Sequence, residues 1–192
     1  MTDFERKADL QRYLQTAREA LLWKLEGLDE YDARRPLTPT GTNLLGLVKH
    51  AAGVEVGYFG DCFQRPFDHV LPWLHDDAEP NADMWATAEE SREDVVDLYR
   101  RVWRHSDATI RALALDAAGR VPWWPMERRE VTLHRVLVHV VADTDRHAGA
   151  SRQPTATPSP TSARVPAGSR CTAFQVRARA RTASSRTTAD SV

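Results

Sequence analysis

Apolar residues recur every three or four positions along several stretches of the chain, which is the spacing of a helix that buries one face. The first stretch runs from Asp3 to about Leu28. We expect its helix to end near Gly27, because glycine commonly follows the last turn of a helix. The apolar positions of this stretch are Leu10, Tyr13, Leu14, Ala17, Leu21 and Leu25.

Two more apolar periods follow residues that are typical helix caps. Thr42 or Asn43 can cap a second helix over residues 44–63, and Thr132 can cap a last helix over residues 133–149. Side-chain oxygens of such residues accept hydrogen bonds from the free N–H groups of the first helical turn. The sequence therefore predicts a start for both helices.

A third apolar period follows Thr87 and Glu90, which together form a capping-box pattern. The helix that it predicts stops before Gly119. Its buried stripe consists of Val95, Leu98, Tyr99, Val102, Trp103, Ile110 and Leu113.

The segments between these helices contain prolines and aromatic residues. Residues 64–86 hold three prolines and are expected to form a long ordered loop, and the sequence VPWWP at 121–125 predicts a packed aromatic loop. No clear alternation of apolar and polar residues indicates a strand. Four helices with apolar faces predict an all-α four-helix bundle over residues 1–149.

The composition changes after Gly149. Residues 150–192 contain fourteen Ser or Thr and four Pro, and they lack Leu, Ile and Met. A segment of this kind cannot bury enough apolar surface to offset its conformational entropy, so a disordered C-terminal tail is predicted. Residues 1–149 carry 19 Lys and Arg against 26 Asp and Glu, whereas the tail carries 7 against 1. The scattered arginines of the tail do not favour nucleic-acid binding.

Other global features indicate a cytoplasmic protein. Its two cysteines, Cys62 and Cys171, suggest neither a disulfide framework nor a thiolate zinc site. The N-terminus lacks the apolar stretch of a signal peptide, and no run of residues is long and apolar enough to span a membrane. We therefore expect no membrane partner.

The last predicted helix carries the residues of greatest chemical interest. Asp143 and His147 are one turn apart and lie at the margin of its apolar stripe, so both can reach one metal ion. His139 is also one turn from Asp143, but it lies farther from the apolar centre and ranks below His147. The alternatives are a plain contact between Asp143 and His147, or an ion pair of Asp143 with Arg146.

The second predicted helix supplies a third candidate ligand, His50. Gly46, Gly53 and Gly57 lie on the same side of this helix as His50. Glycine costs about 1 kcal/mol in a helix interior, so three of them indicate that another backbone comes close. A histidine that is simply buried and hydrogen-bonded in the core is the alternative.

Three segments together resemble the DinB-like superfamily of four-helix metalloproteins: LLGLVKHAAGVE at 44–55, WW at 123–124 and VTLHRVLVHVVADTDRHAG at 131–149. Within it, they are most similar to the branch that includes the metal-binding domain of mycothiol-dependent maleylpyruvate isomerase and related actinobacterial proteins. The resemblance implies a divalent metal bound by His50, Asp143 and His147. Zn²⁺ is the expected ion and Ni²⁺ the alternative.

The resemblance also implies a function, with two readings left open. In the first, a low-molecular-weight thiol such as mycothiol is the cosubstrate and attacks an electrophile, in S-transfer or isomerisation, with His139 or Glu55 as base or supporting residue. In the second, the protein is a non-catalytic metal-stabilised binding or stress-response module. A homodimer is compatible with either. The sequence departs from the family after Gly149, where the tail resembles the product of a frameshift.

Overall fold

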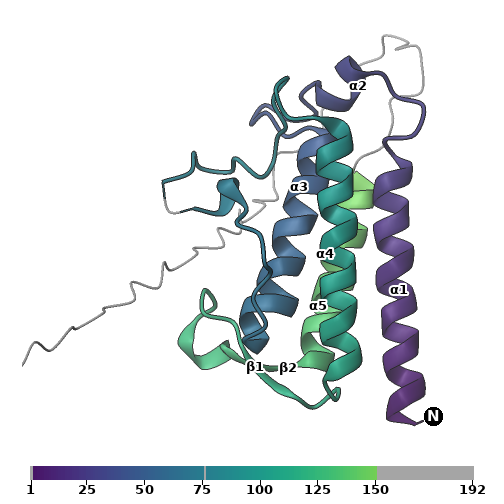
Figure 1. Cartoon of the computed structure of the whole chain (residues 1–192), viewed down its shortest axis with the longest axis vertical. Coiled ribbons are helices and arrows are strands. Elements are labelled where there is room, and N and C mark those ends of the chain that lie inside the picture. Colours follow the sequence, from purple (N-terminus) through teal and green to yellow (C-terminus); the bar gives the residue numbers. More distant parts are fainter. Residues whose placement is uncertain (1, 76, 151–192) are drawn as a thin grey trace, which may run out of the picture.

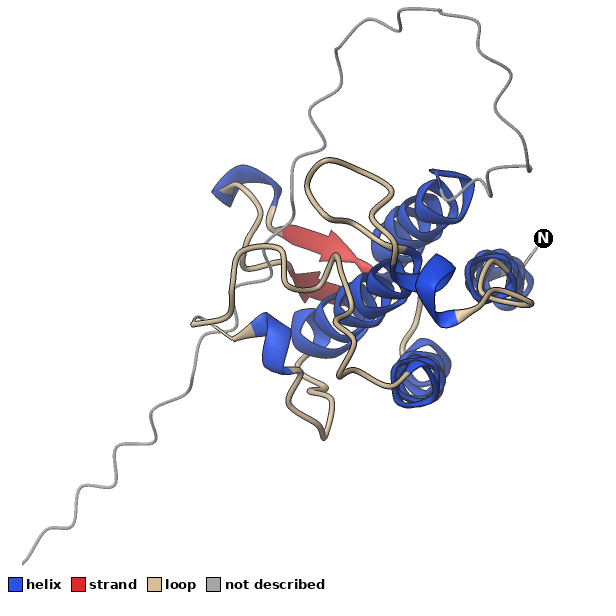
Figure 2. Cartoon of the chain, turned by 90° about the horizontal axis from the view of Figure 1, so that it is seen from above, coloured by secondary structure: helices blue, strands red, loops and turns tan. Residues whose placement is uncertain are grey.

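Four long helices form a bundle in the computed structural model, which describes residues 2–75 and 77–150 (Figure 1). They are α1 (Asp3–Trp23), α3 (Leu44–Glu55), α4 (Arg92–Ala112) and α5 (Leu133–Ala150). α1 packs against α5, α3 packs against α4, and further contacts join α3 to α5 and α1 to α4. Figure 2 shows the helices gathered around a common centre. The predicted all-α four-helix bundle is confirmed.

The first helix begins as predicted and ends earlier. Thr2 and Glu5 form a reciprocal capping box at its start. The predicted continuation to about Leu28 is wrong, because the helix ends at Trp23 and the chain goes on through tight turns to Gly27, which has a φ of +72°. Glycine adopts this left-handed conformation without steric cost. A short helix, α2 (Glu30–Arg34), follows and was not predicted.

The second predicted helix is present over residues 44–63, but it changes from an α-helix to a π-helix and then to a 3-10 helix. Asn43 caps α3 and accepts a hydrogen bond of 2.7 Å from the Gly46 N–H. After Glu55 the chain continues as a π-helix, η1 (Val56–Gly60), and then as a 3-10 turn, η2 (Asp61–Phe63). All residues from Leu44 to Gly60 are buried, so this is the central helix of the bundle.

The start predicted for the third helix is wrong. α4 begins at Arg92, and its cap is Ser91, whose hydroxyl accepts a hydrogen bond from the Asp94 N–H at 3.3 Å. Glu90 does accept a hydrogen bond from the Thr87 N–H at 2.9 Å, but that contact closes a turn before the helix. The contact between Thr87 and Glu90 therefore forms, but it does not cap the helix.

The structure also contains two short strands that the sequence pattern did not indicate. β1 (Ala118–Arg120) and β2 (Glu130–Thr132) form an antiparallel pair. The loop between them contains the aromatic segment 121–125 and a 3-10 helix, η4 (Met126–Arg128). The segment 64–86 forms a long loop as predicted, with one further 3-10 helix, η3 (Pro72–Leu74). Three-residue strands are too short to produce a visible alternation in the sequence.

The core of the bundle has two parts. One surrounds the first half of α3, and the other lies where η1, α5 and the hairpin meet. Fully buried residues include Leu45, Val48 and Tyr99 in the first part and Phe59, Leu137 and Val140 in the second. Within the described residues, no helix has the length and apolar character of a membrane span.

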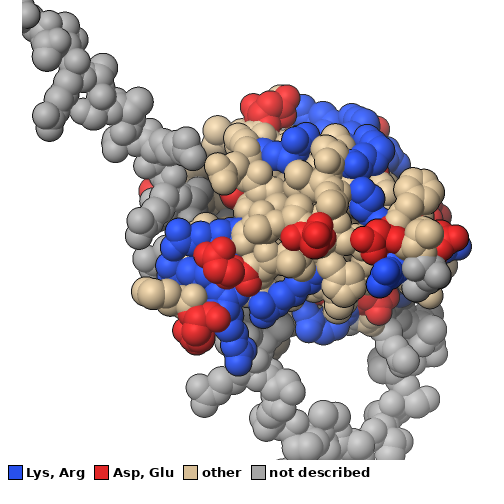
Figure 3. All heavy atoms as spheres, turned by 90° about the horizontal axis from the view of Figure 1, so that it is seen from below, with Lys and Arg blue, Asp and Glu red and all other residues tan. Residues whose placement is uncertain are grey.

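Basic and acidic side chains are interspersed around an area of other residues on the face of the molecule shown in Figure 3.

The tail predicted to be disordered, residues 150–192, lies outside the described residues except for Ala150, which ends α5. The boundary at Gly149 stays a prediction.

Candidate metal centre

α3 presents His50 toward α5 from within the core. The side chain of His50 is 8% exposed. Its Nδ1 atom lies 2.7 Å from the carboxylate oxygen Oδ2 of Asp83, a residue of the long loop. Its other ring nitrogen, Nε2, lies 3.9 Å from Oδ2 of Asp143. The two nitrogens of one imidazole therefore face two different carboxylates.

α5 presents Asp143 and His147 on one face, one turn apart, as their spacing predicts. Thr132 fixes the start of this helix, because its hydroxyl accepts a hydrogen bond from the Arg135 N–H at 3.3 Å. Nε2 of His147 lies 3.6 Å from Oδ2 of Asp143. The other carboxylate oxygen, Oδ1, accepts a hydrogen bond of 2.5 Å from Arg146. One oxygen of Asp143 thus faces the histidines and the other faces an arginine.

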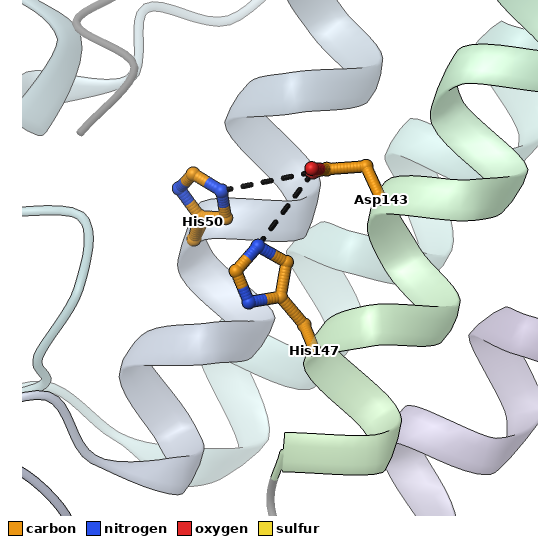
Figure 4. Close-up of side chains that lie close together, drawn as sticks. All are labelled: His50, Asp143 and His147. Carbon is orange, nitrogen blue, oxygen red and sulfur yellow. Dashed lines mark ion pairs between the residues drawn. The ribbon is translucent and has the colours of Figure 1, made fainter. Parts of the chain in front are cut away.

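The three side chains converge between the two helices (Figure 4). One donor atom from each of His50, Asp143 and His147 can be chosen so that all three lie within 4.8 Å of one another. The two imidazole rings meet edge to face, with centroids 4.7 Å apart. Because zinc bonds to nitrogen and oxygen are about 2.0–2.2 Å long, donor atoms at these separations can share one ion after small movements.

The electrostatics of the group suit a cation. Burial of the ring, followed by the nearby His50, lowers the pKa of His147 to about 4. His147 is therefore neutral at pH 7 and keeps a lone pair that a metal can accept. Asp143 supplies the negative charge. Two imidazoles and one carboxylate are a donor set that zinc uses in catalytic sites, where a fourth position stays open.

His139, the competing ligand of the sequence analysis, is not part of the converging group. Its ring lies against Tyr58 at 4.8 Å and Trp124 at 5.3 Å, measured between ring centroids. Burial lowers the pKa of His139, so it too is a neutral imidazole at pH 7. The structure brings His147 to Asp143 and His50, and it places His139 among aromatic side chains one turn away.

Glu55, the other residue considered as a base, is engaged elsewhere. Its two carboxylate oxygens accept hydrogen bonds from Arg18 at 2.8 and 2.5 Å, and both side chains are fully buried. Arg18 also donates to Asp107 at 3.0 Å. An ion pair with an arginine accounts for the burial of Glu55.

Asp83 contacts His50 directly, and the sequence pattern did not single it out. It lies in a loop with several other acidic residues, and no periodicity in that loop distinguishes it from them. The sequence offered one indirect indication, because the glycines on the same side of α3 as His50 predicted that another backbone would come close there. A Cβ atom on Gly46 would lie 2.2 Å from the carbonyl oxygen of Met84, so that approach is confirmed.

The fold and the site together define a class of protein. A four-helix bundle with a histidine on its central helix, and a carboxylate and a histidine one turn apart on its last helix, resembles the DinB-like arrangement. The family model of the mycothiol S-transferases matches residues 9–152. The chain belongs to this family, which is DinB-like, in agreement with the superfamily that its motifs resemble. No curated protein matches the chain.

Proposed function

We propose that this protein is a divalent-metal-dependent S-transferase that uses mycothiol or a similar low-molecular-weight thiol. His50, Asp143 and His147 would hold the ion, which is most simply Zn²⁺, with Ni²⁺ as the alternative. The observation that supports the proposal is the convergence of one donor atom from each residue, within 4.8 Å, in a chain of the mycothiol S-transferase family. We further propose a cytoplasmic location, where such thiols stay reduced.

Two of the three ligand residues, His147 and Asp143, have distinct roles in this proposal. His147 is kept neutral by burial, so its ring does not need to lose a net proton before it binds the ion. Asp143 is held by Arg146 through one oxygen, which leaves the other oxygen directed at the two rings. An ion with an open coordination position would lower the pKa of a thiol bound there and so favour its thiolate form.

The proposed reaction is a substitution at an electrophilic carbon. The thiol loses its proton to water or to a base, and the sulfur lone pair forms a new C–S bond. The leaving group departs with the electron pair of the bond that breaks, so no external oxidant or reductant is required. The half-buried neutral ring of His139, one turn from Asp143, is the candidate base for the thiol proton.

A cobalt-substituted protein tests the proposal, because Co²⁺ reports its ligands by its visible absorption. Addition of mycothiol should produce a sulfur-to-cobalt charge-transfer band and accelerate loss of a chromogenic aryl halide. Asp143→Asn should abolish both responses, whereas Asp145→Asn, an exposed neighbour on the same helix, should leave both intact. A metal-loaded protein that shows neither band nor turnover would contradict the enzyme proposal and favour a non-catalytic metal-stabilised module.

A further inference from the structure

The loop segment 82–86 crosses α3 close to His50 and is bound to the start of that helix. The side chain of Asn43 accepts a hydrogen bond from the Ala86 N–H and donates one to the Ala86 carbonyl, both at 3.1 Å. The backbone N–H of Asn43 donates to the carbonyl of Met84 at 3.1 Å. The residue that caps the helix therefore also fixes the end of the loop segment.

Two further α3 residues, one and two turns along the helix, hold the rest of the segment. Lys49 donates from Nζ to the carbonyls of Ala82 and Trp85, at 3.0 and 2.8 Å. Gly46 lets the backbone of Met84 lie where any side chain would collide with it. The segment is therefore held on both sides of its second residue by groups that belong to the helix of His50.

That second residue is Asp83, and its carboxylate is placed on Nδ1 of His50 at 2.7 Å. The Asp83 side chain is 16% exposed and that of His50 is 8% exposed, so water competes little for this contact. A carboxylate accepts hydrogen bonds and cannot donate one when ionised. The contact therefore requires a proton on Nδ1, and in the neutral ring this leaves the lone pair on Nε2, the nitrogen that faces Asp143.

We propose that Asp83 is a positioning residue for the metal site, which fixes the orientation and the tautomer of His50 so that Nε2 is its metal-binding atom. The proposal rests on the metal site of the proposed function and adds a residue to it. Histidines that bind metals in proteins generally donate their other ring N–H to a carboxylate, a carbonyl or water, and loss of that partner costs about 10–100-fold in metal affinity or activity.

The first test is the zinc affinity of the full chain, measured by competition with a chromogenic chelator. Asp83→Ala should weaken zinc binding by about 10–100-fold. Asp83→Asn keeps an acceptor oxygen at the same reach and should recover part of the loss. Asp77→Ala is the matched control, because Asp77 lies in the same loop with a 92% exposed side chain, and it should bind zinc as the wild type does.

The second test uses metal-free protein and so does not depend on the proposed function. Long-range ¹H–¹⁵N correlation of the histidine rings should show His50 with its proton on Nδ1 in the wild type and in Asp83→Asn. The Asp83→Ala protein should show a mixture of tautomers or a shift of the proton to Nε2.

Two results would overturn the proposal. One is a folded Asp83→Ala protein that binds zinc as tightly as the wild type, even if its melting temperature is lower, because Asp83 would then serve only the loop. The other is a His50 ring that keeps its proton on Nδ1 without Asp83. If the wild type binds no zinc, the proposed function fails, and the tautomer measurement alone decides whether Asp83 positions His50.

Discussion

Two clusters of polar side chains include residues of α3, and they differ in how closely their members contact one another. We call the first the ion-pair cluster; its members are Arg18, Glu55 and Asp107. We call the second the histidine cluster; its members are His50, Asp143 and His147. Each contains at least one carboxylate removed from bulk water, and a buried carboxylate is costly unless it has a partner.

The ion-pair cluster is closed by the protein itself. The Arg18 guanidinium contacts both oxygens of Glu55 and one of Asp107 at 2.5–3.0 Å. Its pKa is raised: burial opposes the charge, but the attraction and hydrogen bonds of Glu55 outweigh it, and Asp107 adds to them. These distances are those of strong charge-assisted hydrogen bonds.

The histidine cluster has looser internal contacts. Oδ2 of Asp143 lies 3.6 and 3.9 Å from the two imidazole nitrogens, beyond ordinary hydrogen-bond length. The low pKa of His147 means that this ring brings no positive charge at neutral pH. The comparison teaches that the ion-pair cluster is satisfied by its own contacts, whereas the histidine cluster keeps donor atoms at spacings that one cation could share.

The largest effect is expected from opening the ion-pair cluster. Arg18→Met leaves the buried carboxylate of Glu55 without its partner and should lower the free energy of unfolding by about 3–5 kcal/mol. Urea titration followed by circular dichroism measures this. The double variant Arg18→Met with Glu55→Leu should recover much of the loss, and an Arg18→Met protein as stable as the wild type would contradict a structural role.

Metal removal should affect the other cluster. An ion that binds only the folded state adds about 2.7 kcal/mol at a concentration one hundred times its Kd, so chelation should lower the melting temperature of a zinc-loaded protein by several degrees. Calorimetry with and without chelator measures the shift. His147→Ala should melt at the same temperature under both conditions. An unchanged melting curve in a wild-type protein shown to be metal-loaded would contradict the claim that metal binding stabilises the fold.

A third prediction concerns Gly46, where the backbone of the loop segment 82–86 comes close to α3 near His50. Gly46→Ala places a methyl group 2.2 Å from the carbonyl oxygen of Met84. Relief of this overlap should cost about 1–3 kcal/mol of stability and weaken zinc binding as well. Gly53→Ala is the control, since its methyl would meet only the flexible side chain of Leu74, at 3.3 Å. Equal effects of the two variants on zinc affinity would refute the special role of the Gly46 contact.

A fourth prediction concerns pH. The pKa of His147 falls from 6.5 to about 4 in the folded protein. Because the unfolded chain then binds more protons, the metal-free protein should lose stability as the pH falls from about 6.5 toward 4. Melting temperatures across this range, with chelator present, measure the slope. His147→Ala should show a shallower slope, and an identical slope would mean that other groups cause the acid sensitivity.

The sequence predicted the parts of this molecule that depend on helical periodicity. The apolar stripes gave the bundle, and the one-turn spacing of Asp143 and His147 gave their shared face. Gly46 correctly indicated a close backbone, whereas Gly53 meets only the side chain of Leu74. Burial on a helix face depends on local sequence, and for that reason these features could be predicted without a structure.

The features that were missed depend on contacts between distant segments. Asp83 meets His50 only because the loop is tied to Asn43 and Lys49, and nothing in its own neighbourhood indicates this. Glu90 looked like part of a helix cap, but in the fold it also pairs with Lys49 at 2.7 Å. Such tertiary partners decide what a short polar motif does, and a local pattern does not contain them.

Elemental analysis of the purified full chain tests most directly whether His50, Asp143 and His147 hold one divalent ion. The wild type and His139→Ala should each contain close to one equivalent of zinc or nickel. His50→Ala and His147→Ala should lose most of it, while circular dichroism shows that they remain helical. A wild-type protein without metal, or a loss of metal in His139→Ala but not in His147→Ala, would contradict the assignment.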